Sequence, residues 1–222
     1  KERTREMEKP RVKCEIHDGI AEVMLTRGDK LNALDRAMFS AIDETLTQLA
    51  RHKGLRAVIL HGEGRAFCAG LDVENFAALL SGEKRFPNLT ERYQNRITNI
   101  YQHVGYGWKE LPVPVIAAIH GVALGGGFQI AMGADIRFSA PDAKFSLMEM
   151  RWGLIPDMSV TQTIRDFVPM DVAKELIFTG KVIKGEEAAR LNLVTHICEK
   201  PLEEAMALAR EIASKSPDAV RA

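Results

Sequence analysis

Short apolar runs and helically spaced apolar positions alternate along the chain. The apolar runs at residues 12–16 and 20–26 are separated by Asp18-Gly19, a dipeptide that favours a hairpin turn. Asp35 stands where a helix N-cap is expected, ahead of apolar residues at helical spacing, Met38, Ile42, Leu46 and Leu49. This pattern predicts a hairpin, then a helix, and then a buried strand over residues 57–60.

The second half of the chain continues the alternation. Further strands are predicted over residues 113–119, 135–139, 144–147 and 194–198. Helices are predicted to begin near Gly126 and to cover residues 159–167, 172–178, 185–191 and 202–213. Residues 77–108 are polar and irregular, with glycine and proline breakers, and they predict a surface excursion that carries one helix.

A supersecondary unit occurs twice. Residues 57–62 (AVILHG) lead to 69–72 (AGLD), and residues 114–121 (PVIAAIHG) lead to 124–127 (LGGG). A glycine between a strand and a helix permits a positive φ, and the first N–H groups of a helix have no intrahelical acceptor. Two such turns side by side would aim two backbone N–H groups at one point, as in an oxyanion hole. Alternatively, the glycines only allow tight packing of helix on strand.

Composition excludes several classes of protein. The 222 residues suffice for one sizeable domain or two small ones, and 46% hydrophobic residues argue against disorder. The 30 basic and 30 acidic residues cancel, which argues against nucleic-acid and anionic-membrane partners. The apolar stretch at residues 115–134 is interrupted by glycines and is interpreted as the centre of a globular domain rather than a membrane span.

The cysteines and the first residues indicate the compartment. Three scattered cysteines without a CxxC pair predict neither a disulfide framework nor a zinc site, and they favour a reducing, cytoplasmic location. Residues 1–11 form a charged leader that lacks the apolar core of a signal peptide. GxGxxG, GxxxxGK[ST], GxSxG and HExxH motifs are all missing, and the six histidines form no metal-ligand cluster in sequence.

Two carboxylates are candidates for proton transfer. Glu149 lies in a largely apolar segment, where burial would raise its pKa toward the range useful for acid–base chemistry. Asp157 follows eight residues later. The alternatives are that Glu149 pairs with Arg151 or another cation, and that Asp157 caps the helix beginning near Ser159.

Seven blocks in order resemble the crotonase, or enoyl-CoA hydratase/isomerase, superfamily. They are 30–34 (KLNAL), 65–72 (RAFCAGLD), 112–127 (PVPVIAAIHGVALGGG), 134–137 (ADIR), 153–156 (GLIP), 178–181 (FTGK) and 187–194 (EAARLNLV). The resemblance implies an α/β spiral of ββα units over residues 12–200, with residues 201–222 beginning a helical C-terminal trimerisation region. It also implies trimers or dimers of trimers that bind an acyl-coenzyme A thioester, with coenzyme A entering as part of the substrate and no separate cofactor or metal.

The resemblance assigns residues to the site. Leu71 and Gly126 would donate the two backbone N–H groups that hold the thioester oxygen. Asn32, Ala69, Gly70 and Asp72 would lie along the path of the substrate. Typical hydratases have a glutamate three residues after the central glycine, where this chain has Gln129.

That departure favours one reaction within the superfamily. An amide can orient water but cannot exchange a proton near neutral pH. The residues therefore predict an enzyme that shifts a double bond in an enoyl- or dienoyl-CoA, with Glu149 as the proton shuttle and Asp157 as a second acid. One alternative is a 2-enoyl-CoA hydratase that uses Glu149 while Gln129 holds the water. Another is a non-catalytic subunit that binds coenzyme A thioesters.

Overall fold

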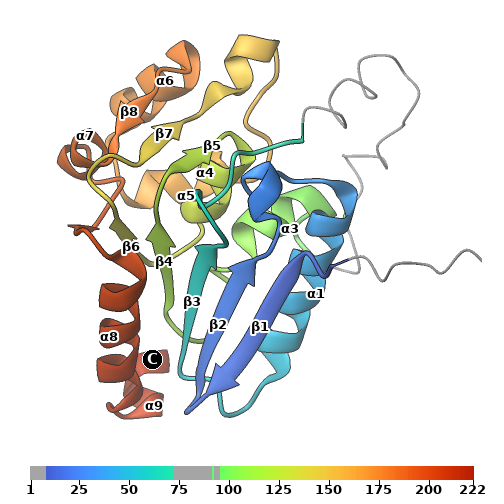
Figure 1. The fold of residues 1–222 in the computed structure, drawn as a ribbon, viewed down its shortest axis with the longest axis vertical. Helices are drawn as coiled ribbons and strands as arrows, with labels where there is room; N and C mark the ends of the chain where they lie inside the picture. The colour runs from blue at the N-terminus through green and yellow to red at the C-terminus, as the bar shows by residue number, and fades with distance from the viewer. Residues whose placement is uncertain (1–8, 73–91, 93–95) are drawn as a thin grey trace, which may run out of the picture.

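A six-stranded sheet forms the base of the fold in the computed structural model, which describes residues 9–72, 92 and 96–222 (Figure 1). Its order is β1-β2-β3-β4-β6-β9. The strands are β1 (Val12–His17), β2 (Ile20–Leu25), β3 (Ala57–Gly62), β4 (Val115–Ile119), β6 (Ile136–Ser139) and β9 (His196–Ile197). Only β1 and β2 pair antiparallel, around the predicted Asp18-Gly19 turn, and the remaining pairs are parallel. The predicted hairpin and central strands are therefore confirmed.

The strands of a smaller, three-stranded sheet lie between those of the large sheet in chain order. It contains β5 (Val122–Leu124), β7 (Lys144–Ser146) and β8 (Ile183–Lys184), in the order β5-β7-β8. Strand β5 follows β4, and β7 follows β6, after short links. In each of these two pairs the first strand belongs to the large sheet and the second to the small one. Helix α4 (Gly126–Ala131) follows β5 and completes one ββα unit. The predicted α/β architecture is confirmed.

Helix α1 (Arg36–Arg51) shows how local sequence determines an element. The Asp35 side chain accepts a hydrogen bond from Met38 N at 2.7 Å, so the predicted N-cap is confirmed. The apolar face of the helix is buried against the core. The other α-helices are α3 (Ile100–Tyr106), α5 (Val160–Thr163), α6 (Met170–Thr179), α7 (Gly185–Arg190), α8 (Pro201–Ala213) and α9 (Pro217–Arg221).

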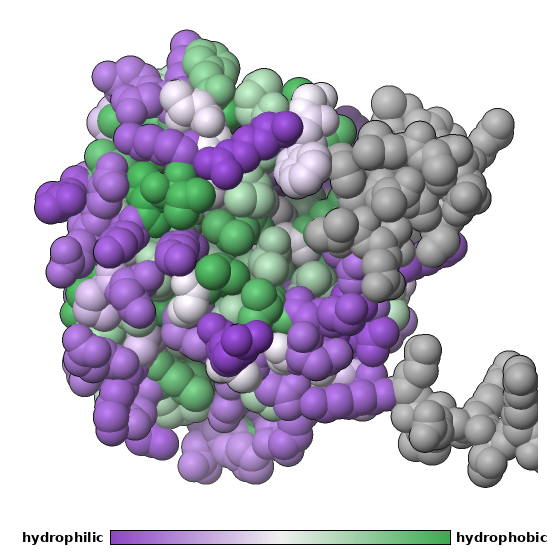
Figure 2. Space-filling model, turned by 45° about the horizontal axis from the view of Figure 1, so that its top comes forward, coloured by the Kyte–Doolittle hydropathy of each residue, from purple (hydrophilic) through white to green (hydrophobic). Residues whose placement is uncertain are grey.

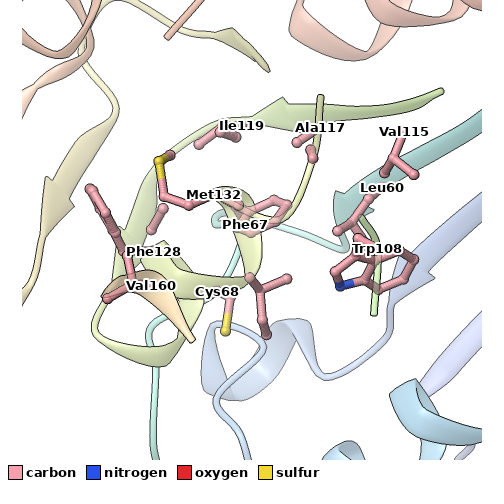
Figure 3. Packing of buried hydrophobic residues seen from close by; sticks show 14 of the residues in the cluster. Leu60, Phe67, Cys68, Trp108, Val115, Ala117, Ile119, Phe128, Met132 and Val160 are labelled. Carbon is pink, nitrogen blue, oxygen red and sulfur yellow. The ribbon is translucent and has the colours of Figure 1, made fainter. Parts of the chain in front are cut away.

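Helix α8 covers the outer face of the large sheet (Figure 1). Its Ala205 and Ala209 are fully buried against Ile59 and Ile116, among other strand residues. The opposite face of the sheet contacts the main core. There the side chains of Phe67 and Cys68 pack in one cluster with Phe128 of α4 and with Met132, the residue that follows α4 (Figure 3). The two predicted repeat units thus share one core.

Some predicted elements differ from the structure. The predicted helix over 159–167 is divided into α5 and a 3₁₀ helix, Ile164–Asp166, and the strand over 194–198 is only two residues long. The predicted helix after residue 72, most of the excursion at 77–108 and most of the leader at 1–11 lie outside the described residues. Among the helices that the structure describes, none is long and apolar enough to cross a bilayer.

Candidate active site

A short parallel ladder joins the two glycine turns of the repeat. Cys68 and Ala123 form an isolated parallel bridge. Cys68 N donates to Val122 O at 3.0 Å, and Leu124 N donates to Cys68 O at 3.0 Å. Leu71 and Gly126 each lie three residues beyond the bridge on their own segment. The ladder therefore brings the two predicted donors to equivalent places on neighbouring segments.

Both predicted donors follow a glycine with a positive φ. Gly70 has a φ of 85° and Gly125 a φ of 51°. A Cβ on Gly70 would lie 2.5 Å from Leu124 O, so the close approach of the turns also requires glycine there. Within the described part of the chain, neither Leu71 N–H nor Gly126 N–H has a hydrogen-bond acceptor. Two N–H groups are thus available to a ligand, and their use as an oxyanion hole stays a prediction.

The loop before α1 lies beside the first turn. Leu34 N donates to Gly70 O at 2.7 Å, and Ala69 N donates to Leu31 O at 2.9 Å. Gly70 is buried, whereas Ala69 is half-buried. These bonds, with the bridge between Leu34 and Leu71, place the two segments side by side. A lining role for Ala69 and Gly70 remains a prediction.

Asn32 and Asp72 hold this loop from inside. Asn32 is fully buried, and its amide donates to Ala66 O at 2.8 Å while its oxygen accepts from Arg27 N at 2.9 Å. Asp72 is also buried, and it forms an ion pair with Arg27. As folded, Asn32 has no exposed surface with which to bind a substrate, and its side-chain polar atoms are hydrogen bonded within the protein.

Glu149 lies next to the second turn. It belongs to a 3₁₀ helix, Met148–Trp152, and a Cβ on Gly125 would be 3.5 Å from its Oε1. Oε1 accepts a hydrogen bond from Gln129 Nε2 at 2.6 Å. Oε2 is buried and has no partner among the described residues. A buried carboxylate oxygen without a donor is unusual and calls for a ligand or a proton.

The surroundings of Glu149 favour its protonated form. Burial is the main cause that raises the pKa of this carboxyl, and the charge of Asp157 raises it further. The hydrogen bonds from the Glu149 backbone and from Gln129 act in the opposite direction. In the part of the chain described here, no ion pair joins Glu149 to Arg151 or to another cation.

Asp157 lies close enough to Glu149 to influence its charge. The residue is exposed as a whole, yet the protein around its carboxyl raises its pKa by burial. Helix α5 begins after Ser159 without a side-chain cap, so the interpretation of Asp157 as its cap is wrong. The left-handed backbone of Ser159, with a φ of 74°, directs the chain into the helix instead.

Sequence reasoning missed a second polar cluster, between α1 and α3. The carboxylate of Asp43 accepts hydrogen bonds from Arg96 and from His103 Nδ1, the latter at 2.7 Å. Burial and the charge of Arg96 lower the pKa of His103. The one available signal was an aspartate in the middle of an apolar helix face, beside Ile42.

Two histidines near the ends of strands have structural partners. His61 Nε2 lies 3.0 Å from Glu22 Oε1, and His120 Nε2 lies 2.9 Å from Gly64 O. Across residues 9–72, 92 and 96–222, no group of three or more histidine, cysteine or acidic side chains could hold a metal ion.

Comparisons with known proteins show what the chain is similar to. The family model described as enoyl-CoA hydratase/isomerase matches residues 15–222. A probable enoyl-CoA hydratase of Bacillus subtilis (strain 168) is 38% identical over 90% of this chain and 75% of its own length. Mitochondrial methylglutaconyl-CoA hydratase of Mus musculus is 33% identical over 93% of this chain and 65% of its own.

An isomerase and a solved structure are also similar. Mitochondrial Delta(3,5)-Delta(2,4)-dienoyl-CoA isomerase of Dictyostelium discoideum is 32% identical over 91% of this chain and 71% of its own length. The crystal structure of enoyl-CoA hydratase from Mycobacterium tuberculosis H37Rv superposes with a TM-score of 0.80 at 31% identity, covering 96% of this chain and 79% of that one. The chain thus spans between 65% and 75% of the length of these three relatives.

Proposed function

The chain belongs to the enoyl-CoA hydratase/isomerase family, and from that premise we propose that it moves a carbon–carbon double bond in an acyl-coenzyme A thioester, with Glu149 as the proton shuttle. The unpartnered, buried Oε2 of Glu149 carries this proposal. A carboxyl with a raised pKa exchanges protons efficiently near neutral pH.

The proposed reaction needs one carboxylate and two N–H donors. Glu149 Oε2 removes a proton from C2 of a 3-enoyl thioester, and the electron pair moves into the carbonyl to give a dienolate. Leu71 N–H and Gly126 N–H hydrogen bond to the negative oxygen, which lowers the barrier most where water is excluded. Glu149 returns the proton at C4, and the double bond ends between C2 and C3.

The state of Gln129 supports isomerisation over hydration. Hydration by two carboxylates needs a second proton-exchanging group beside Glu149, and an amide is not one. Gln129 Oε1 accepts from Met158 N at 2.9 Å and from Val160 N at 3.4 Å, so its acceptor oxygen is already occupied. Asp157 supplies a second acid for a more distant carbon, which supports a dienoyl substrate such as the one in the name of the Dictyostelium relative.

Hydration is the second candidate. Relatives 33% to 38% identical carry the name hydratase. In that case Glu149 would activate a water molecule, and the second N–H of the Gln129 amide would hold that water in place. A large gain of hydration in Gln129→Glu would indicate that the natural protein lacks the second acid.

The products of three substrates distinguish these functions. Purified protein is given 2-enoyl-, 3-enoyl- and 3,5-dienoyl-CoA separately, and products are followed by chromatography with mass detection. A positional isomer of unchanged mass is expected, and reaction of the dienoyl substrate would implicate Asp157. A product heavier by one water would replace the proposal with hydration. Binding of the thioesters without turnover would indicate a non-catalytic subunit.

We also propose assembly into trimers or dimers of trimers, as the family resemblance implies, and a cytoplasmic location. Exposed apolar side chains between residues 150 and 182 support the assembly, because such groups are usually covered in a partner. Figure 2 shows hydrophobic residues gathered between hydrophilic margins on one face. Met150, Trp152, Ile155, Phe178 and Val182 are each at least 42% exposed. Analytical sedimentation of the purified protein tests the assembly. A protein that stays monomeric at micromolar concentration would contradict the proposal.

A further inference from the structure

The amide of Gln129 is fixed at both ends. The residue is on α4 and is only 1% exposed. Its Oε1 faces the backbone N–H groups of Met158 and Val160, whereas its Nε2 faces Glu149 Oε1. It therefore connects the segment before α5 with the carboxyl of the site.

An unusual backbone conformation brings the two N–H groups together. Ser159, between Met158 and Val160, has a φ of 74° and a ψ of 5°, in the left-handed region that a residue other than glycine rarely adopts. N–H groups on either side of a left-handed residue converge into a concave site for one oxygen, called a nest. Ser159 Oγ also donates to Gln102 O at 3.1 Å, which holds the nest against α3.

The nest determines which end of the amide faces Glu149. Backbone N–H groups only donate, so the group in the nest must be the oxygen and not the amide nitrogen. The nitrogen must then donate to Glu149 Oε1. With Oε1 held, Oε2 is the oxygen left to carry the reacting proton.

We propose that Gln129 is a positioning residue that acts through Glu149, fixing which of its two oxygens meets the substrate and favouring its ionised form. This inference deepens the proposed function and rests on Glu149 being its proton shuttle. Two other groups affect Glu149 in the described residues, its own backbone N–H and the carboxylate of Asp157. Of these three groups, the Gln129 amide is the hydrogen-bond donor that a side-chain substitution can remove, because the other donor belongs to the backbone and Asp157 is an acceptor.

Two variants separate the donor from the packing. Gln129→Met removes both polar ends of the side chain. Gln129→Glu keeps an oxygen for the nest and so preserves the fold, but it replaces the donor with a second carboxylate. Thr163→Val is the matched control, because Thr163 is fully buried near the nest and, among the described residues, its hydroxyl donates only to Val160 O, at 3.5 Å.

Carbon-13 NMR of glutamate carboxyls, titrated with pH, gives a readout that needs no turnover. The Glu149 signal is the one that disappears in Glu149→Gln. The signal of the glutamate added by Gln129→Glu is the one that remains in the double variant Gln129→Glu/Glu149→Gln. We expect both Gln129 variants to raise the titration midpoint of the Glu149 signal by about one pH unit or more. Thr163→Val should leave the midpoint unchanged.

Kinetics complete the test. In Gln129→Met we expect kcat for the isomerised substrate to fall by about 10- to 100-fold with little change in KM, and the acid limb of the pH–rate profile to move upward. An unchanged Glu149 midpoint and an unchanged acid limb in both variants would overturn the positioning role. A raised midpoint in a protein that isomerises nothing would support the positioning of Glu149 while contradicting the proposed function.

Discussion

Two carboxylates of this protein lie in polar clusters, and they differ in whether a buried oxygen is left without a hydrogen-bond partner among the described residues. Between α1 and α3, Asp43 accepts from both Arg96 and His103. In the candidate site, Glu149 receives one side-chain hydrogen bond, from Gln129, and its Oε2 is left without a partner. Both hydrogen bonds on Asp43 end on its Oδ1, and among the described residues Asp43 has no buried oxygen without a partner, whereas Glu149 has one.

The contrast separates a structural role from a chemical one. A buried polar network whose members are paired rigidifies a fold, whereas an unpaired buried oxygen destabilises it unless something else binds there. The only other buried side-chain atom without a partner in the described residues is Thr98 Oγ1. A destabilising, unpaired oxygen at Glu149 is what we expect of a group that binds its partner only when the substrate is present.

Glu149→Gln should have the largest effect on activity. Removing the proton shuttle is expected to lower kcat by about 10²- to 10⁴-fold, the usual contribution of general acid–base catalysis. Stability should stay the same or rise, because a buried charge is removed. Steady-state kinetics and thermal unfolding measure both, with the exposed Glu175→Gln as a control. A variant with full activity would contradict the assigned role.

Asp43→Ala should show the opposite pattern. Loss of this buried carboxylate leaves Arg96 and His103 without their shared acceptor, and we expect the free energy of unfolding to fall by about 3 kcal/mol. The kcat of the folded protein should stay unchanged. Urea unfolding checks the first statement, and Asp171→Ala, at an exposed site on α6, is the control. A loss of kcat without a loss of stability would remove the distinction between the clusters.

The two clusters should respond to pH with opposite signs. Glu149 has a raised pKa when folded, so its contribution to stability is complete below its unfolded pKa and is lost as pH rises through its folded pKa. His103 has a lowered pKa, so its contribution is present above pH 6.5 and is lost as pH falls through its folded pKa. Each effect is limited to about 1.4 kcal/mol per unit of pKa difference.

Unfolding free energies between pH 4 and 8 test these signs. Relative to the natural chain, Glu149→Gln should gain stability as pH rises above the unfolded pKa of Glu149. His103→Gln should show less loss of stability on acidification below pH 6.5. Parallel curves for all three proteins would show that neither group is perturbed.

Asp157→Asn should have the smallest effect. Asp157 raises the pKa of Glu149 through like charge, so its removal should lower that pKa and move the acid limb of the pH–rate profile to lower pH. With a 3-enoyl substrate the rate at neutral pH should change only a few-fold. A much larger loss with a 3,5-dienoyl substrate would show that Asp157 transfers a proton itself. Equal losses with both substrates would show that Asp157 acts only through the effect of its charge on Glu149.

Local patterns predicted the elements well where one cause dominates. The Asp18-Gly19 hairpin, the Asp35 cap and the strands of the two repeat units depend on residues close in sequence, and the structure has them. Glu149 was identified by its apolar neighbours, and its raised pKa agrees with that reasoning.

Contacts between distant segments could not be predicted in this way. The orientation of Gln129 depends on backbone N–H groups 29 and 31 residues away, and the partners of Asp43 lie 53 and 60 residues away. Asn32 was placed on the substrate path because its block matches the family pattern. Its burial depends on contacts with a distant segment, since its amide donates to Glu63 O and Ala66 O, 31 and 34 residues away.

The ladder between Cys68 and Ala123 places Leu71 and Gly126, the two predicted N–H donors, at equivalent positions on neighbouring segments. These donors belong to the main chain, so replacing the side chain of Leu71 removes neither of them. An alanine scan of this protein would therefore detect its acids and overlook half of the proposed site. Adding a methyl group at Gly70 or Gly125, where the backbone turns left-handed, is the substitution that would reveal that half.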